Sequence, residues 1–324
     1  MKTMTYLEAL RSAMEEELTK DENVFLMGED IGKYGGCYGV TSGLVEKFGA
    51  DRVMDTPISE LAITGAAVGA AMQGKRPVVE IMYADFLPVC ADQIVNQACK
   101  MRYILGKDVE VPLVIRTAYG GGGRYSFNHS QSPEAWFLNA PGLTIMMPST
   151  PADAKGMMVS AIRSNNPVLF FEQKHLYKTL EGAVPEEEYE VPIGKGDIKR
   201  EGKDITVVAT GWMVHKALEA AENLQKDGIE VEVLDPRTLK PLDEELILQS
   251  VRKTGRLLTV HEACLTGGFG AEVCAIVTEK AFDSLKKPVK RLAAPDSIIP
   301  FAPNLEDAFY PDTKKLEEAI RSMM

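Results

Sequence analysis

The sequence predicts an α/β protein made of two three-layer α/β/α domains. Short apolar runs of strand length alternate with helix-length segments through almost the whole chain. This alternation is typical of a parallel sheet that is covered by helices on both faces. It is interrupted once, over residues 179–203, and a chain of 324 residues is long enough for two domains that each have a core.

The first half of the chain alternates regularly between predicted strands and helices. Ser59 can cap a helix that runs through Gln73 and is ended by Gly74. Two further helices are expected over residues 88–105 and from residue 151 to about residue 163. The predicted strands of this half are 24–28, 52–56, 76–84, 111–117, 143–149 and 167–172.

The second half repeats this alternation after a segment of different character. Residues 179–203 are charged, contain Pro and Gly, and have few long apolar runs, so they predict an inter-domain linker and the first strand of a second domain. The domain boundaries are therefore 1–178 and 204–324. The elements expected after Asp204 are strands over 204–211, 229–235, 255–260 and 289–294, and helices over 212–227, over 243–253 and after Gly270.

Composition and charge exclude several classes of function. The net charge of −11 argues against nucleic acid and against an anionic membrane as partners. The longest uncharged small and apolar run, Leu61–Met72, is shorter than the ~20 residues of a membrane helix. The acidic runs Glu15–Glu17 and Glu186–Glu188 are interpreted as solvated faces.

The five cysteines and the N-terminal residues bear on location. The number of cysteines is odd, and no CxxC pair or Cys/His metal spacing occurs. Charged residues interrupt the first apolar stretch, which is not the pattern of a signal peptide. We therefore expect a reduced, cytoplasmic protein.

One predicted helix has an acid in its first turn and a face of small residues. Glu60 can be explained by favourable interaction with the helix dipole, which is the simpler interpretation. Gly65, Ala66, Gly69 and Ala70 share one face, although each glycine costs a helix about 1 kcal/mol relative to alanine. We expect another backbone to approach this face closely, either within the fold or across a subunit interface.

The strand that follows this helix lies in a very apolar stretch that contains three acids. Glu80, Asp85 and Asp92 need hydrogen-bond partners or shifted pKa values if they are buried. They are either structural acids or the lining of an acidic cavity. Phe86 is either ordinary core or a plate on which a flat ring stacks.

A run of four glycines, residues 120–123, precedes His129. The run follows the predicted strand 111–117, and α/β proteins place ligand loops after strands. Because polyglycine is costly to order, the run predicts a segment that moves or that allows close approach to its backbone. His129 is either structural or a proton-transfer group. No GxGxxG fingerprint occurs, so NAD binding is not indicated, and the glycines before the helix in HEACLTGGFGAE (261–272) resemble only a weak anion site.

An ordered set of motifs along nearly the whole chain carries a family resemblance. They include RVMDTPISE, GAAVGAAMQGKRPVVEIMYADF, HSQSPEAW, PGLTIMMPSTPADAKG, EVLDPRTLKPLD and GRLLTVHEA. The set resembles the β subunit of the thiamine-diphosphate-dependent decarboxylating component of 2-oxo acid dehydrogenase complexes, of the pyruvate, branched-chain 2-oxo acid or acetoin type. The resemblance implies a pyrimidine-binding domain followed by a transketolase C-terminal-type domain.

The resemblance also implies an activity and partners. The expected reaction is oxidative decarboxylation of a 2-oxo acid, or cleavage of acetoin, with acyl transfer to the lipoyl group of an acyltransferase core. The active enzyme should contain two α and two β chains, with thiamine diphosphate between them. Magnesium and the diphosphate should be held by the α subunit through a GDG motif, which this chain lacks.

Family roles can be carried over to four residues around the cofactor ring. Glu60, in the match to DTPISE, should hydrogen-bond the aminopyrimidine ring nitrogen. Phe86 matches the aromatic residue that stacks on the pyrimidine. Ile58 and Met82 match pocket positions beside it.

Further family roles fall outside the ring pocket. Glu29 and Asp92 match acids that line a proton tunnel between two active centres. Gly65 and Gly69 match the small helix face at the contact between β subunits. His129 matches the histidine that serves acyl transfer to the lipoyl group, and the glycine loop would then close over substrate and admit the lipoyl arm.

A structural potassium ion is the last feature that the resemblance implies. Family β subunits often bind it near the strand 111–116, partly through backbone carbonyls. Ser164 and Asn166 stand where side-chain ligands occur.

Two alternatives remain beside this interpretation, and the substrate stays open among the three types. The chain could be the pyrimidine-binding half of a split transketolase. That site would need basic residues for sugar phosphates, and the loop region offers chiefly Arg116 and Arg124. The chain could also be a non-catalytic α/β binding protein whose glycine loop contacts a partner.

Overall fold

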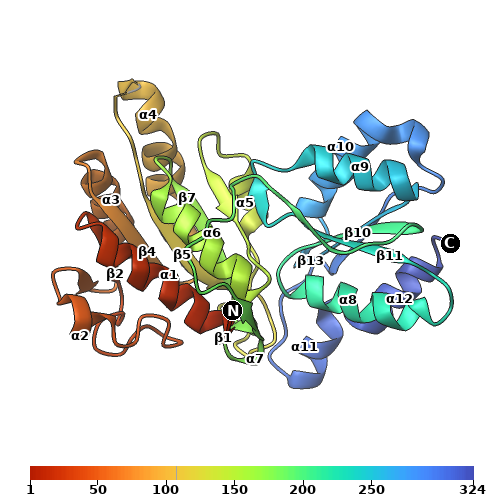
Figure 1. The fold of residues 1–324 in the computed structure, drawn as a ribbon, viewed down its shortest axis with the longest axis horizontal. Helices are drawn as coiled ribbons and strands as arrows, with labels where there is room; N and C mark the ends of the chain where they lie inside the picture. The colour runs from red at the N-terminus through yellow and green to blue at the C-terminus, as the bar shows by residue number, and fades with distance from the viewer. Residues whose placement is uncertain (107) are drawn as a thin grey trace. The chain divides into compact units, whose positions relative to one another are not determined.

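The computed structural model describes residues 1–106 and 108–324 and divides them into two compact units. The first unit contains Met1–Tyr119 and Trp136–Ile193, and the second contains Gly120–Ala135 and Gly194–Met324. Each is built on a mainly parallel sheet with helices, which confirms the predicted α/β class (Figure 1). The glycine loop lies in sequence between two strands of the first unit, yet it packs with the second.

The first unit contains a parallel sheet with the strand order β6-β7-β5-β4-β2-β3. Its strands are β2 (Val24–Gly28), β3 (Val53–Asp55), β4 (Arg76–Tyr83), β5 (Val114–Tyr119), β6 (Thr144–Met146) and β7 (Val168–Gln173). A separate antiparallel pair joins β1 (Lys2–Thr5) to β8 (Glu181–Val184). That pairing was not predicted, because its two strands are far apart in the sequence.

Helices pack around this sheet as the alternating pattern predicts. They are α1 (Tyr6–Lys20), α2 (Leu44–Phe48), α3 (Glu60–Met72), α4 (Cys99–Leu105), α6 (Pro151–Arg163) and α7 (Leu176–Thr179), while α5 (Glu134–Leu138) follows the glycine loop. Figure 1 shows α1 and α6 side by side, and these two helices are in contact. Thr5 and Glu8 form a capping box on α1, and Thr150 caps α6, whose first residue is proline.

The segment expected to form one helix over 88–105 is not a single α-helix. A 3₁₀-helix covers Ala84–Cys90, a π-helix covers Gln93–Ala98, and only Cys99–Leu105 is α-helical. Pro88 lies inside the 3₁₀-helix and has no backbone N–H to donate. The side chain of Ser59 likewise makes no capping hydrogen bond to α3.

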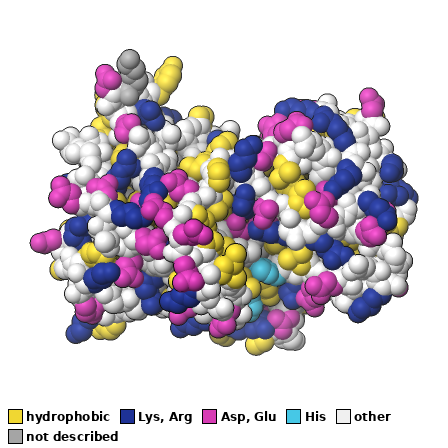
Figure 2. All heavy atoms as spheres, in the orientation of Figure 1, with side chains coloured by type: hydrophobic (Ala, Val, Ile, Leu, Met, Phe, Trp, Pro, Cys, Tyr) yellow, Lys and Arg dark blue, Asp and Glu magenta, His cyan; other side chains and the backbone are white. Residues whose placement is uncertain are grey.

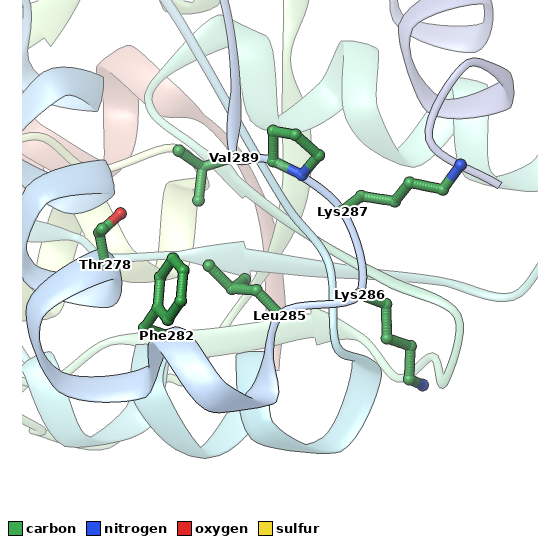
Figure 3. A pocket seen from close by; sticks show the side chains of 7 residues that line it. Thr278, Phe282, Leu285, Lys286, Lys287 and Val289 are labelled. Carbon is green, nitrogen blue, oxygen red and sulfur yellow. The ribbon is translucent and has the colours of Figure 1, made fainter.

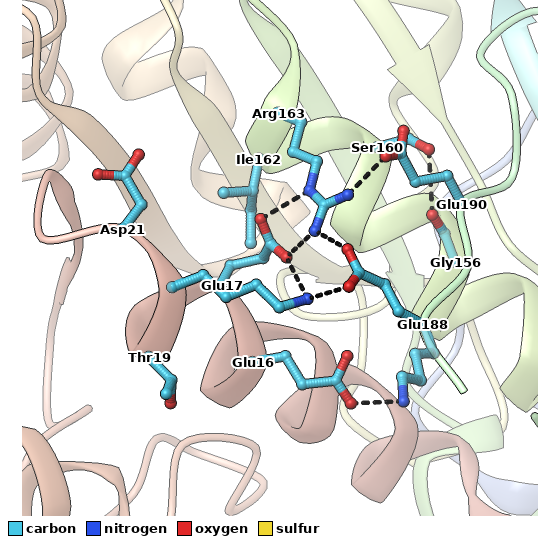
Figure 4. A network of polar contacts seen from close by, with 12 residues as sticks. Glu16, Glu17, Thr19, Asp21, Gly156, Ser160, Ile162, Arg163, Glu188 and Glu190 are labelled. Carbon is cyan, nitrogen blue, oxygen red and sulfur yellow. Dashed lines mark hydrogen bonds and ion pairs between the residues drawn. The ribbon is translucent and has the colours of Figure 1, made fainter. Parts of the chain in front are cut away.

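The first acidic run, interpreted as a solvated face, is partly or fully buried and forms ion pairs, which corrects that interpretation, whereas Glu186–Glu188 are exposed as expected. Arg163 contacts Glu17 at 2.6 Å and also pairs with Glu188, which comes from the second run (Figure 4). Glu16 pairs with the buried Lys155 at 2.6 Å. These contacts tie α1 to α6 and to the segment after β8, so the acids stabilise the unit.

The second unit contains a five-stranded sheet with the order β14-β13-β10-β11-β9, in which only β9 is antiparallel to its neighbour. Helices α8 and α12 lie together against it, over a core that includes Val207, Val233 and Leu316 (Figure 1). The strands of this sheet are β9 (Asp197–Arg200), β10 (Ile205–Ala209), β11 (Val231–Asp235), β13 (Leu257–Cys264) and β14 (Lys290–Ala294), and the short strand β12 (Thr238–Lys240) is not part of it. The helices are α8 (Trp212–Gln225), α9 (Glu244–Thr254), α10 (Phe269–Ala281), α11 (Pro303–Phe309) and α12 (Thr313–Arg321), with a 3₁₀ turn over Phe282–Ser284.

The surface carries charges of both signs. On the face in Figure 2, Lys and Arg side chains are interspersed with Asp and Glu, and no broad basic region gathers there (Figure 2). No helix in residues 1–106 or 108–324 combines the length and apolar character needed to cross a membrane.

Candidate active site

Three neighbouring strands of the first unit bring several of the predicted site residues to one edge of its sheet. Strand β2 pairs in parallel with both β3 and β4, and Gly28 at its end lies opposite Asp55 and Glu80. Residues that follow these strands therefore emerge at the same carboxyl edge, where open α/β sheets bind ligands. Glu29 follows β2, Ile58 and Glu60 follow β3, and Phe86 follows β4.

The side chains at this edge combine apolar surface with a carboxylate. Glu60 is the first residue of α3 and is half-buried. Ile58 is 82% exposed, which is unusual for so large an apolar side chain. Met82 and Phe86 are half-buried, and the Phe86 ring meets Tyr83 edge-on at 5.7 Å between centroids. These side chains fit a flat heteroaromatic ring, because such a ring needs apolar walls and one carboxylate that hydrogen-bonds a ring nitrogen.

Glu29 lies in the electrostatic field of other acids at this edge. Burial raises its pKa above the ordinary value, and the charges of Glu60, Asp30 and Glu80 raise it further. Glu29 therefore keeps a proton to higher pH than an exposed glutamate does. Perturbed carboxyl groups of this kind gather at sites of proton transfer.

Glu80 belongs to a buried ionic network rather than to an open acidic cavity. Arg116 on β5 contacts Glu80 and donates two hydrogen bonds, of 2.7 and 2.6 Å, to Glu172 on β7. The hydroxyl of Tyr177 donates to Glu172 at 2.6 Å. Burial raises the pKa of Glu80 against the opposing effect of Arg116. Of the two interpretations of this acid, the structure supports the structural one.

The loop after β2 rests on this network. Gly36 has a positive φ of 80°, and a Cβ at this position would lie 3.1 Å from a carboxylate oxygen of Glu80. The backbone of Cys37 hydrogen-bonds the same carboxylate. The network thus supports the loop that begins with Glu29.

Two of the remaining predicted residues face neighbours in the first unit, and one does not. Asp92 is exposed and accepts a 2.8 Å hydrogen bond from Asn96. A Cβ on Gly65 would lie 3.2 Å from the amide oxygen of Gln93, so the close approach there comes from a side chain. A Cβ on Gly69 would meet no atom within 4 Å, so this glycine faces outward.

The glycine loop and His129 both lie in the second unit. Gly120 and Gly122 have φ values of 86° and 85°, which favour glycine. A Cβ on Gly121 would lie 2.1 Å from the ring of Tyr310. The prediction of close approach to this backbone is therefore confirmed. His129 is half-buried.

Sequence reasoning missed three acids beside this loop. Glu134, Glu262 and Glu306 are all buried. Burial raises the pKa of Glu134 to about 8, with a smaller contribution from the charge of Glu262. Glu262 could have been noticed as an acid at the end of an apolar strand, whereas nothing in the sequence near Glu306 marks it out.

The residues predicted near a potassium ion use their side chains elsewhere. Asn166 accepts a 2.6 Å hydrogen bond from Arg102, and the Ser164 hydroxyl bonds the backbone of Asn166. Arg76 donates to the carbonyl of Ser164 at 3.2 Å. Both side chains are thus engaged with other groups of this chain. Within the described residues, no group of three or more His, Cys, Asp or Glu side chains could hold a metal ion.

A separate pocket of about 470 Å³ lies in the second unit (Figure 3). None of the predicted site residues lines it, and Phe282, which does, is 66% exposed. The pocket is lined by Thr278, Phe282, Leu285, Lys286, Lys287, Pro288 and Val289.

Comparison with known proteins identifies the class of both units. Residues 2–179 match the transketolase pyrimidine-binding domain, and residues 194–316 match the transketolase C-terminal domain. A solved structure titled as a split-gene transketolase, an inactive β4 tetramer, superimposes with a TM-score of 0.80. It is 25% identical and covers 99% of this chain and 98% of its own. The two units thus define a transketolase-like protein of a thiamine-diphosphate-dependent enzyme family.

Curated relatives are more similar and extend over the full length. The 2-oxoisovalerate dehydrogenase subunit beta of Bacillus subtilis is 48% identical, covering 100% of this chain and 99% of its own. The acetoin:2,6-dichlorophenolindophenol oxidoreductase subunit beta of the same species is 47% identical, covering 95% and 94%. The pyruvate dehydrogenase E1 component subunit beta of Bacillus subtilis is 44% identical, covering 100% of this chain and 99% of its own.

This chain belongs to the family of β subunits of 2-oxo acid and acetoin dehydrogenases. The family resemblance drawn from the motifs is confirmed. So are the oxidoreductase class and the β-subunit designation, which implies an α partner.

Proposed function

We propose that this chain supplies the pyrimidine side of a thiamine diphosphate site that a separate α subunit completes. The observation that carries the proposal is the carboxyl edge of β2, β3 and β4, where Phe86 follows β4 and the charge of Glu60 adds to burial in raising the pKa of Glu29. The active form would contain two α and two β chains, with magnesium held by the α subunit.

The residues of this chain would hold and polarise one ring of the cofactor. Glu60 is the first residue of α3, and its carboxylate would share a proton with the pyrimidine ring nitrogen. Ile58, Met82 and Phe86 would form the apolar walls that exclude water. When bound, thiamine diphosphate supplies the electron sink for decarboxylation.

Other residues would move protons and assist transfer. Glu29 and Asp92 would carry protons toward the second active centre. His129 would take or supply a proton as the acyl group passes to the lipoyl group of an acyltransferase core. Gly69 would lie at the contact between β subunits, with Gly65 on the same helix.

Several finer points remain proposals beside these roles. The domain limits would be 1–178 and 204–324, with 179–203 as linker and first strand of the second domain. The location would be cytoplasmic. A potassium ion near Ser164 and Asn166 would be bound partly by backbone carbonyls, and the two side chains would have to give up their present partners to act as ligands.

The split-transketolase alternative is disfavoured by the two arginines on which it depended. Arg116 is buried between Glu80 and Glu172. Arg124 pairs with Glu306 and Asp307. A guanidinium that is engaged by two carboxylates is a poor ligand for a sugar phosphate.

The experiment that tests the proposal is purification of the chain with its co-expressed α partner, followed by native mass spectrometry and a substrate panel. We expect an α2β2 mass with thiamine diphosphate and magnesium, and reduction of a lipoyl acceptor by pyruvate, a branched-chain 2-oxo acid or acetoin. A β-only assembly without cofactor would contradict the proposal. Ketol transfer between sugar phosphates would instead support the split-transketolase alternative.

A further inference from the structure

The glycine loop is fixed to its own unit by two buried carboxylates. The backbone N–H of Gly121 donates to Glu262, and that of Gly122 donates to Glu306, each at 2.9 Å. Glu306 is 1% exposed, so its charge must be compensated inside the protein. The loop provides that compensation, and the carboxylate in turn holds the loop.

Arg124 binds the same Glu306 carboxylate from its side chain. Its guanidinium lies 3.1 Å from the second oxygen of Glu306 and 2.6 Å from Asp307, and it donates to the carbonyl of Pro303 at 2.9 Å. The Glu306 carboxylate thus accepts hydrogen bonds from the backbone N–H of Gly122 and from the side chain of Arg124. Arg124 itself has a φ of 62°, which a non-glycine residue adopts only when its surroundings hold it there.

The far end of the loop is held as well. The ring of Tyr310 fills the space where a Gly121 side chain would be, and its hydroxyl donates to the carbonyl of Ser130 at 3.1 Å. His129 lies between the contacts of Arg124 and those of Ser130. Each side of the histidine is therefore anchored to α11 or to the residue that follows it.

We propose that Glu306, acting through Gly122 and Arg124, is a positioning residue that holds the His129 segment in place for acyl transfer. The four glycines then belong to a loop that is held in place. This differs from the closing lid that the family resemblance suggested. The inference rests on the proposed role of His129, but the anchoring of the loop can be measured without it.

The test uses the α2β2 enzyme with Glu306→Gln, Arg124→Met and the double variant. Glutamine keeps the shape and an acceptor for Gly122 but removes the charge that pairs with Arg124. The matched control is Asp307→Asn, which removes the exposed carboxylate from the same arginine. Assembly and melting temperature are checked first, so that an unfolded variant is not misread.

Two rates separate positioning from general damage. Reduction of an artificial dye measures decarboxylation alone, and acylation of a free lipoyl domain measures transfer. We expect Glu306→Gln to slow acylation by about 10- to 100-fold, since small misplacements of a catalytic group have effects of that size. The dye-linked rate and the KM for the 2-oxo acid should change by less than about twofold, as should both rates in Asp307→Asn.

Hydrogen exchange supplies a readout that does not depend on activity. The amide of Gly122 should exchange faster in Glu306→Gln, because a neutral acceptor is weaker and the ion pair to Arg124 is lost. The double variant should be no worse than the single ones, because both substitutions remove the same Glu306–Arg124 pair. Unchanged exchange, or equal loss of both rates, would overturn the inference. Faster exchange together with full acylation by His129→Ala would keep the anchored loop but refute the proposed role of His129.

Discussion

Glu29 and Glu60 lie at the ends of neighbouring parallel strands, and the charge of Glu60 adds to the burial that raises the pKa of Glu29. The two acids follow β2 and β3, which have no other strand between them. The charge of Glu60 therefore helps Glu29 to keep its proton to higher pH. A carboxyl group of this kind suits a site in which protons must enter and leave a bound ring.

Replacing Glu29 with Gln tests its part in that transfer. We expect kcat of the α2β2 enzyme to fall by about 100-fold, the lower end of the range for lost proton transfer, with little change in KM. Gln cannot release a proton, although it keeps the shape of the protonated acid. Steady-state kinetics with a saturating 2-oxo acid measures both constants. Glu22→Gln, an exposed acid on the preceding turn, is the control, and equal rates in the two variants would contradict the role.

Glu134 should make the stability of the chain depend on pH. Its pKa is about 8 in the folded protein against 4.5 for an ordinary glutamate. The stabilisation is fully present below pH 4.5 and declines by about 1.4 kcal/mol per pH unit until it is lost near pH 8. Glu134→Gln should therefore flatten the decline. Denaturant unfolding at about pH 5 and about pH 8 measures the free energy of unfolding of both proteins. An equal decrease between the two pH values in both proteins would refute the prediction.

Breaking the Arg116 network should destabilise the first unit strongly. Arg116→Met leaves Glu80 and Glu172 buried and uncompensated, so we expect a loss of about 3–5 kcal/mol. The loss should be smaller at low pH, because burial raises the pKa of Glu80 and favours its protonated form. Thermal and denaturant unfolding measure it, with the exposed pair variant Asp227→Asn as control. A loss below about 1 kcal/mol would mean that the network is not needed for stability.

Substitutions of Gly69 test the stability of the chain and the assembly of the complex separately. A Cβ there meets nothing in this chain, so Gly69→Ala should stabilise α3 by about 1 kcal/mol. If the helix face lies at a contact between β subunits, the same change should weaken assembly, and Gly69→Leu should weaken it more. Unfolding of the isolated chain and analytical ultracentrifugation of the complex give the two quantities. Normal assembly of the leucine variant would exclude Gly69 from the interface.

Much of the fold could be predicted because its strands are continuous apolar runs. The runs at β2, β4, β10 and β11 lie within two residues of the predicted positions. The expected single helix over 88–105 was wrong because a 3₁₀-helix extends to Cys90 and a π-helix covers Gln93–Ala98, so the regular hydrogen-bond pattern begins only at Cys99. The pairing of β1 with β8 could not be foreseen, since no local pattern encodes a contact between residues 2 and 184.

The same distinction holds for the candidate site. The positions of Glu60 and Phe86 after strand ends could be predicted because each lies in a local motif, while their roles stay predictions. The four glycines predicted a close approach to the backbone, but not that Glu262 and Glu306 would make it. Those acids are 141 and 184 residues away from the amides that they bind. The ion pairs of Glu17 were missed for the same reason, because Arg163 is far away in the sequence.

The most direct test of the central claim is Glu60→Gln in the co-expressed α2β2 enzyme. Decarboxylation is measured by dye reduction, and thiamine diphosphate binding by calorimetry. We predict an intact complex that still binds the cofactor but decarboxylates at least about 100-fold more slowly, because the ring nitrogen has lost its proton partner. A rate within about twofold of the unmodified enzyme, with the cofactor bound, would contradict the assignment of this edge as the pyrimidine site.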